Sequence, residues 1–228
     1  MKKSKTKEIV FTQNNTANLV SVLMTVYNTP FNKVKQAIDS VLKQDFLSYE
    51  LIVIDDGSHL DLSLQILSYC QLHQHKIKYM RHSNCGQSQS INVAVKICNG
   101  DYITILDSDD EYKPNHLSAC LKGIEDNDLI SSHTETIINT PDDYFVPDKN
   151  NHQKNIHVDD CILFATLFGK REVFLNQSFK NKYAADAIFY EQAALDYKVK
   201  KINLRTYIYY RNMSNSISAK LKKESLIK

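Results

Sequence analysis

Apolar and polar positions alternate in blocks along the first half of the chain. Four short runs are rich in apolar and β-branched side chains, which is typical of strands buried on both faces of a parallel sheet. These runs cover residues 19–26, 51–54, 77–81 and 102–106. The segments between them carry apolar residues at helical spacing. Strands that alternate with amphipathic helices predict an α/β fold, in which helices flank a mostly parallel sheet.

The first predicted helix follows Pro30, which suits a first helical turn, with Thr29 before it as the N-cap. Val34, Ile38 and Val41 then fall on one helical face. The same periodicity predicts further helices at residues 61–73, 87–98 and 184–196, and in a segment opened by Pro114.

The second half of the chain is less regular. Residues 139–160 carry no periodic apolar signal, and we expect a long functional loop that could close over a site as a lid. Residues 202–211 alternate in the manner of an edge strand. We therefore expect one domain at residues 19–218, between a tail at residues 1–18 and a basic tail at residues 219–228.

Composition narrows the class of protein further. The chain has 228 residues and a net charge of +2, which argues against nucleic acid as a partner. Its five cysteines have no CxxC spacing, so we expect reduced thiols and a cytoplasmic protein. No apolar run is long enough to cross a bilayer. The lysine-rich ends are interpreted as solvated tails, with weak attraction to the inner face of the membrane as the alternative.

Two of the predicted strands end in acidic residues. Asp55 and Asp56 follow one strand, and Asp107, Asp109 and Asp110 follow another. The carboxyl ends of parallel strands meet at one edge of a sheet, where ligands bind. One such Asp is commonly a turn residue or a helix cap, but two clusters favour a bound cation. Mg²⁺ or Mn²⁺ is expected, because hard cations take carboxylate oxygens and leave positions for phosphate.

The glycines do not support a dinucleotide-binding fold. Such a fold needs a glycine-rich turn after its first strand, whereas this chain has TVYNTP there and five glycines in all. An EF-hand is also disfavoured, because Tyr112 stands where that loop needs glycine. A phosphate-bearing ligand is therefore expected to meet a metal rather than a glycine-rich loop.

Several motifs occur together and in order. They are VSVLMTVYN, DSVLKQDFLSYELIVIDDGS, GQSQSINVAVKICNGDYITILDSDD and YYRNMSNSIS. Together they resemble glycosyltransferase family two, the inverting nucleotide-sugar transferases with the Rossmann-like A-type fold. The resemblance covers residues 19–117 closely and continues in order to about residue 218. It implies a nucleotide-sugar-binding half at residues 19–112 and an acceptor-binding half at residues 113–218.

The resemblance also implies roles for matching positions in the first half. Thr25 and Tyr27 would lie beside the nucleotide base, and Asn28 belongs to the same nucleotide-sugar-binding group. Asp56 would accept a hydrogen bond from the base. Asp107 would contact the ribose or the metal.

Further roles concern the metal and the chemistry. Asp109 would ligate the metal, Asp186 would be the catalytic base, and Arg211 could meet phosphate. Glu191 is an alternative base on the same predicted helix. The chain departs from the family at Ile91, where an arginine is common, which leaves part of the diphosphate contact unassigned.

The implied function is transfer of a sugar from a nucleoside-diphosphate sugar, UDP most commonly, to an acceptor hydroxyl in cell-surface polysaccharide, capsule or lipopolysaccharide synthesis. The acceptor would be a saccharide or a lipid-linked saccharide, and a homo-oligomer is left open. Two other classes remain as alternatives. One is a non-catalytic nucleotide-sugar-binding module, and the other is a phosphatase that uses a DxD motif.

Overall fold

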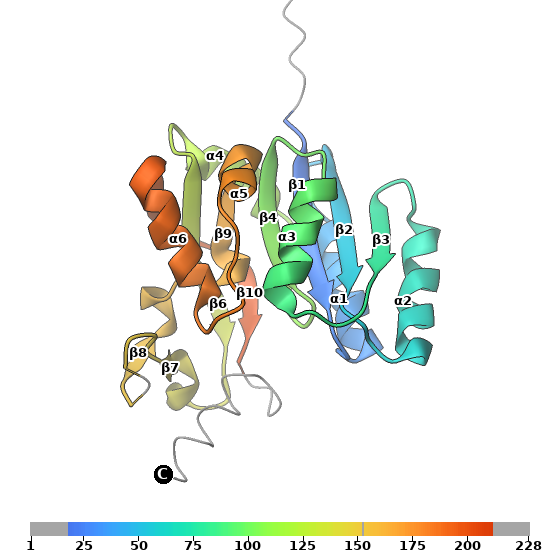
Figure 1. The fold of residues 1–228 in the computed structure, drawn as a ribbon, viewed down its shortest axis with the longest axis horizontal. Helices are drawn as coiled ribbons and strands as arrows, with labels where there is room; N and C mark the ends of the chain where they lie inside the picture. The colour runs from blue at the N-terminus through green and yellow to red at the C-terminus, as the bar shows by residue number, and fades with distance from the viewer. Residues whose placement is uncertain (1–17, 152, 212–228) are drawn as a thin grey trace, which may run out of the picture.

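The computed structural model describes residues 18–151 and 153–211 of the chain. One large sheet runs through the molecule, with strands in the order β3-β2-β1-β4-β9-β6-β10-β5 (Figure 1). Its strands are β1 (Val20–Val26), β2 (Tyr49–Asp55), β3 (Ile77–Arg81), β4 (Tyr102–Asp107), β5 (Glu111–Tyr112), β6 (Leu129–Ile137), β9 (Leu167–Lys170) and β10 (Val199–Tyr210). Strands β9 and β5 run antiparallel to their neighbours and the other pairs are parallel. The prediction of a mostly parallel sheet is confirmed.

Helices cover both faces of this sheet (Figure 1). They are α1 (Phe31–Leu42), α2 (Leu60–Leu72), α3 (Gln87–Ile97), α4 (His116–Ile124), α5 (Arg171–Asn176) and α6 (Ala185–Asp196). One apolar cluster joins the sheet to α1, α2 and α4, and a second joins the opposite face to α3, α5 and α6. Strands β1, β2 and β4 are buried between the two clusters, which explains their continuously apolar sequences.

Residues 139–160 contain more structure than the missing periodicity predicted. Two short 3₁₀ helices (Pro141–Tyr144 and Val158–Asp160) flank an antiparallel hairpin made of β7 (Phe145–Pro147) and β8 (Asn155–His157). Strands of three residues are too short to give an alternating pattern. A third 3₁₀ helix (Phe164–Thr166) then leads into β9 and α5, neither of which was predicted.

Two further details differ from the predictions. Pro30, not Thr29, is the N-cap of α1, and the Thr29 hydroxyl instead lies 2.7 Å from the Ser108 hydroxyl. Strand β10 is not the edge of the sheet, because the short strand β5 pairs with its outer side. The lysine-rich tails and the end of the predicted domain at residue 218 lie outside the described residues.

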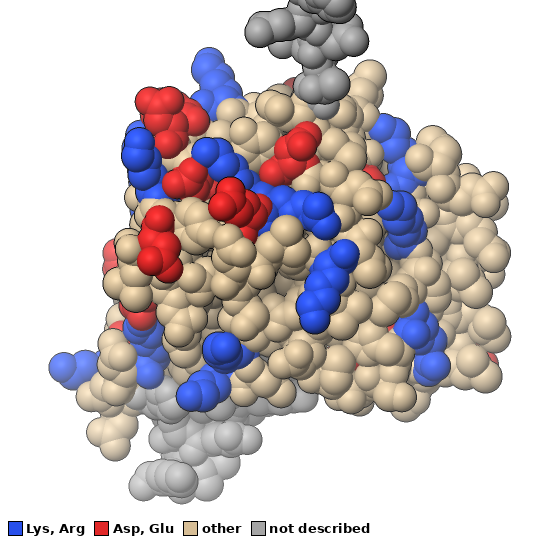
Figure 2. Space-filling view, turned by 45° about the horizontal axis from the view of Figure 1, so that its top comes forward, with Lys and Arg blue, Asp and Glu red and all other residues tan. Residues whose placement is uncertain are grey.

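The edge of the sheet at the amino ends of the parallel strands carries mixed charge. Figure 2 brings this edge forward and shows Lys and Arg beside Asp and Glu. Ion pairs such as Lys170–Asp128 and Lys200–Glu125 lie here. None of the helices within the described residues is long and apolar enough to cross a membrane.

Asp110 connects the two halves of the sheet. Its side chain is 2% exposed and accepts hydrogen bonds from the Tyr207 hydroxyl (2.6 Å) and the Tyr210 backbone N–H (2.8 Å). These contacts join the turn after β4 to β10, about 100 residues later. They fix the position of the acidic turn relative to the second half of the chain.

This connection predicts that Asp110→Ala destabilises the protein. The buried Tyr207 hydroxyl and the half-buried Tyr210 N–H lose their acceptor, so the free energy of unfolding should fall by about 1–3 kcal/mol. Urea denaturation measures the change, with Asp126→Ala at an exposed position as the control. Equal stability of the two variants would contradict the assigned role.

Candidate active site

The carboxyl ends of β1, β2 and β4 meet at one edge of the sheet because these strands are parallel neighbours. Thr25 of β1 is in register with Asp107 of β4 on one side and with Ile54 of β2 on the other. Asp56 follows directly after β2. The topology thus brings the two acidic motifs to the same place, as the sequence predicted.

The four acidic residues that follow β4 divide into two pairs with different roles. Asp110 and Glu111 make hydrogen bonds within the fold, Glu111 with the Gln36 amide and the Tyr210 hydroxyl. Asp107 accepts a hydrogen bond from the Gln87 amide (2.7 Å). In the described part of the chain, Asp107 accepts no other side-chain hydrogen bond, and Asp109 accepts none.

Burial raises the pKa values of both carboxyl groups of this second pair. Burial raises the pKa of Asp107 to about 7, and the negative charges of Asp109 and Asp186 add to the effect. Burial also raises the pKa of Asp109. Carboxylate oxygens held close together at a partly buried edge fit a hard divalent cation, because a cation would offset both desolvation and repulsion.

Asp186 lies in the first turn of α6. Its carboxylate accepts hydrogen bonds from the backbone N–H groups of Ala187 (2.8 Å) and Phe164 (3.1 Å). Burial raises the pKa of Asp186 to about 6, although these two donors oppose the shift. A carboxylate with this pKa is ionised at neutral pH and is a stronger base than an exposed aspartate.

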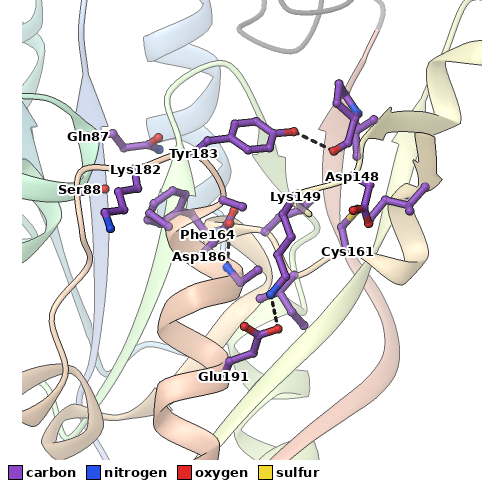
Figure 3. Close-up of a pocket in the computed structure, with 18 of the residues that line it drawn as sticks. Gln87, Ser88, Asp148, Lys149, Cys161, Phe164, Lys182, Tyr183, Asp186 and Glu191 are labelled. Atoms are coloured by element: carbon purple, nitrogen blue, oxygen red, sulfur yellow. Dashed lines mark hydrogen bonds and ion pairs between the residues drawn. The ribbon is translucent and has the colours of Figure 1, made fainter. Parts of the chain in front are cut away.

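Asp186 lines a cavity of about 650 Å³. Its walls come from the start of α3, the β7–β8 hairpin, residues 160–164 and residues 181–187. Figure 3 shows Asp186 beside Phe164, with Gln87 and Ser88 of α3 on another wall. Gln87 therefore lies between this cavity and Asp107, to which it donates its hydrogen bond.

Two contacts hold the β7–β8 hairpin against the cavity (Figure 3). The Tyr183 hydroxyl donates to the Pro147 carbonyl (2.8 Å), and Lys149 forms an ion pair with Glu191. The Glu191 side chain is 62% exposed, so its charge is paired and solvated. Asp186 is the more buried of the two carboxylates that the sequence offered as base.

Asp56 organises the loop between β3 and α3. Its carboxylate, 3% exposed, accepts from the backbone N–H groups of Cys85 (2.8 Å) and Gly86 (2.9 Å) and from the Asn84 amide (3.0 Å). The adjacent Gly57 has φ +81°, and a Cβ there would meet the Asn84 nitrogen at 2.7 Å. Only glycine fits this turn beside Asp56.

The three predicted residues at the end of β1 lie at this same edge but in different settings. Thr25 is buried, whereas Tyr27 is 55% exposed. Asn28 adopts φ +53°, a conformation that asparagine tolerates, and its side-chain oxygen accepts from the His59 N–H (2.9 Å). The Asn28 side chain thus ties the β1–α1 turn to the start of α2.

The Arg211 guanidinium is engaged in contacts within the fold. Its guanidinium donates to the carbonyls of Asp143 (3.0 Å) and Phe145 (3.2 Å) and lies over the Tyr209 ring. Arg211 therefore holds the segment that leads into the hairpin. Its contact with phosphate stays a prediction.

Some site residues were not predicted from the sequence. Gln87 stands within the GQSQSIN motif, so its place after Gly86 was a usable signal. Phe164 and Lys149 come from irregular segments that approach Asp186 only through the tertiary fold. No local pattern marks them.

The comparison with family models decides the classification. Residues 21–189 match the model of glycosyl transferase family 2. The chain belongs to this family. The family resemblance noted in the sequence is confirmed, over most of the region in which its motifs occur.

Curated relatives match over about half of the chain. An uncharacterised glycosyltransferase of Rickettsia bellii is 41% identical over 115 residues, which are 50% of this chain and 16% of the relative. Glycosyltransferase GlyG of Streptococcus pneumoniae is 31% identical over 113 residues, which are 49% of this chain and 37% of GlyG. The matches therefore span well under half the length of these relatives.

Solved structures share the A-type fold of the family. S. aureus TarS 1–349 with UDP-GlcNAc matches with a TM-score of 0.68 at 21% identity, over 88% of this chain and 60% of TarS 1–349. Mannosyltransferase PcManGT of Pyrobaculum calidifontis, with GDP-Man and Mn²⁺, also gives a TM-score of 0.68, at 15% identity over 91% of this chain and 61% of PcManGT. At these identities the likeness establishes the fold.

The raised pKa of Asp107 predicts that wild type and an Asp107→Asn variant differ in stability by an amount that depends on pH. The comparison is made in chelator, so that no metal binds at this edge. The folded state binds this proton more tightly than the unfolded state, so Asp107 costs stability as pH rises from about 4 towards 7. Asp107→Asn removes that cost. Between pH 5 and pH 8, the variant should gain at least about 1 kcal/mol of unfolding free energy relative to wild type.

Urea denaturation at both pH values measures this difference. Asp126→Asn, at an exposed position, is the matched control and should follow wild type. A constant difference between Asp107→Asn and wild type across this range would show that the Asp107 carboxyl is not held at a raised pKa.

Proposed function

We propose that this chain is a metal-dependent inverting glycosyltransferase that moves a sugar from a UDP-sugar to an acceptor hydroxyl. The observation that carries the proposal is the arrangement of Asp107, Asp109 and Asp186. Asp107 ends β4, Asp109 follows it, and Asp186 lies in the first turn of α6 beside the cavity. Burial raises the pKa of Asp107, and the charges of Asp109 and Asp186 add to this rise. A cation held by Asp107 and Asp109 would thus lie near enough to a base at Asp186 for their charges to interact.

Asp107 and Asp109 would hold the divalent cation, Mg²⁺ or Mn²⁺. Their carboxylate oxygens suit either ion, and the solved PcManGT structure contains Mn²⁺ with GDP-Man. A cation bound here would act as a Lewis acid towards the leaving diphosphate. Thr25, Tyr27, Asn28 and Asp56 would position the nucleoside beside it.

Asp186 would take the proton of the acceptor hydroxyl. The backbone donors from Phe164 and Ala187 fix the orientation of its carboxylate, and burial gives it a pKa suited to a general base. The hydroxyl would attack the anomeric carbon from the side opposite the leaving group, so that one displacement inverts the configuration. The β7–β8 hairpin would limit the access of water as a lid.

The two alternatives are less well supported. A non-catalytic binding module has no need for a buried carboxylate with a raised pKa in its cavity, which Asp186 provides. A phosphatase of the DxD type carries its nucleophile on the first strand, whereas this chain carries Asp107 and Asp109 after β4. A saccharide or lipid-linked saccharide of the cell surface remains the proposed acceptor.

Nucleotide binding should depend on a divalent metal. Calorimetry with Mg²⁺ or Mn²⁺ should detect binding of UDP to the protein, and addition of a chelator should abolish that binding. Asp109→Ala should weaken UDP binding in the presence of metal by at least about 10-fold. Loss of a residue that only supports a metal ligand already costs about that much, and loss of a ligand should cost no less. Asp126→Ala is the control. Equal UDP affinity with and without metal would remove the assigned role of Asp107 and Asp109.

Asp186→Asn should lower transfer by about 10²-fold or more, because it keeps the side-chain volume and removes the base. The metal and nucleoside positions are unchanged, so UDP affinity should persist. The assay is release of UDP from a panel of UDP-sugars, with water or saccharides as acceptors. Glu191→Gln is the matched comparison, since Glu191 lines the same cavity but is paired with Lys149.

The pH profile adds a second readout. Wild-type activity should fall as pH drops below about 6, where Asp186 becomes protonated. Loss of activity in Glu191→Gln, together with full activity in Asp186→Asn, would assign the base to the other carboxylate. Full activity in both variants would remove a carboxylate base from the mechanism.

A further inference from the structure

A second group of potential metal ligands lies at the β3–α3 loop, around Asp56. The Asp56 Oδ1 atom is 3.5 Å from the Nδ1 atom of His82, and the Cys85 Sγ atom is 3.6 Å from the same nitrogen. One ligand atom from each residue lies within 4.8 Å of the others. This cluster contains neither Asp107 nor Asp109.

Two of the three spacings between these atoms match those of a tetrahedral zinc site. Zinc binds sulfur at about 2.3 Å and nitrogen or oxygen at about 2.0–2.2 Å. At tetrahedral angles, those bond lengths place neighbouring ligand atoms about 3.3–3.6 Å apart. The distances from His82 Nδ1 to Asp56 Oδ1 and to Cys85 Sγ lie at the upper end of this range. An ion could therefore enter with little movement of the chain.

Neighbouring groups are placed to support the ligands. The His82 Nε2 atom lies 3.3 Å from the Ser90 hydroxyl, which can accept a hydrogen bond from that nitrogen when the other ring nitrogen binds metal. Gly86 and Asn84 donate to Asp56 Oδ2, which fixes the carboxylate. Asp56 Oδ1 accepts the Cys85 backbone N–H (2.8 Å), and zinc would bind through the remaining lone pair of this oxygen. Metal binding would replace the present contact between His82 Nδ1 and the Ser83 carbonyl (2.8 Å).

The ligand types and their exposure favour zinc over magnesium. Thiolate and imidazole are ligands that zinc prefers, whereas magnesium takes oxygen. Cys85 is exposed, and the His82 side chain is 21% exposed, so an ion can reach them from solvent. Three protein ligands would leave a fourth position for water. We propose that Asp56, His82 and Cys85 form a zinc site separate from the cation site at Asp107 and Asp109.

Zinc at this site would also compete with the nucleotide donor. This consequence rests on the proposed function, in which Asp56 accepts a hydrogen bond from the nucleobase. A carboxylate oxygen bound to zinc no longer offers the same lone pair to a base, and the ion with its water would occupy the adjoining space. The chain would then respond to two metals in opposite ways, with Mg²⁺ or Mn²⁺ supporting donor binding and Zn²⁺ opposing it.

Cobalt substitution tests the site without any nucleotide. Co²⁺ bound to a thiolate gives a charge-transfer absorption band in the near ultraviolet, which a site made only of carboxylates does not give. Wild-type protein kept reduced should show the band at one equivalent of Co²⁺ and lose it when Zn²⁺ is added. Cys85→Ser should abolish the band and lower zinc affinity at least about 10-fold.

Two further variants complete the test. Cys161→Ser removes a buried thiol at the cavity and should leave the band intact, whereas His82→Asn should weaken it. Absence of the band in wild type, or its survival in Cys85→Ser, would overturn the site. Loss of the band in Cys161→Ser alone would assign the metal elsewhere and would also overturn it.

Competition is measured separately, as UDP affinity in saturating Mg²⁺ with and without Zn²⁺. Zinc should weaken binding to wild type and not to Cys85→Ser. Unchanged affinity in wild type, despite the cobalt band, would overturn the competition. A protein that shows the band but binds no UDP under any condition would overturn the proposed function and leave the zinc site supported.

Discussion

Three half-buried carboxyl groups close to one another, those of Asp107, Asp109 and Asp186, are the constraint on which this edge of the sheet depends. Burial raises the pKa of Asp107 to about 7, and the like charges of Asp109 and Asp186 add to that rise. Gln87 offers Asp107 one hydrogen bond, and two backbone N–H groups serve Asp186. These donors orient the carboxylates without neutralising them, so the cation that we propose at this edge would stabilise it.

Other acidic residues beside these carboxyl groups form hydrogen bonds within the fold. Asp55 is fully buried beside the site, yet hydrogen bonds from Ser58 and Tyr79 keep its pKa below the usual value, against the opposing effect of burial. Asp110 bonds to β10, although burial raises its pKa well above the usual value. Asp55, Asp56 and Asp110 are therefore all bonded within the fold, whereas Asp107 and Asp109 have fewer protein partners.

The sequence predicted the first half of the fold well because its strands are buried on both faces and its helices are amphipathic. Residues after those strands, such as Asp56 and Asp107, follow from the topology once the strands are known. The second half was harder, because strands of three or four residues show no period and β9 runs antiparallel. Phe164 and Lys149 reach Asp186 only through tertiary contacts, and Asp186 itself was located by resemblance rather than by its local pattern.

The hydrogen bond from Phe164 to Asp186 has an evolutionary consequence. Phe164 belongs to the wall of the cavity, yet its backbone N–H is one of the groups that lower the pKa of Asp186. In the proposed mechanism, selection for a new acceptor would act on that wall, and a shift of its backbone would alter the basicity of the carboxylate. Acceptor preference and the pH range of activity would then be inherited together, and neither trait would diverge far without the other.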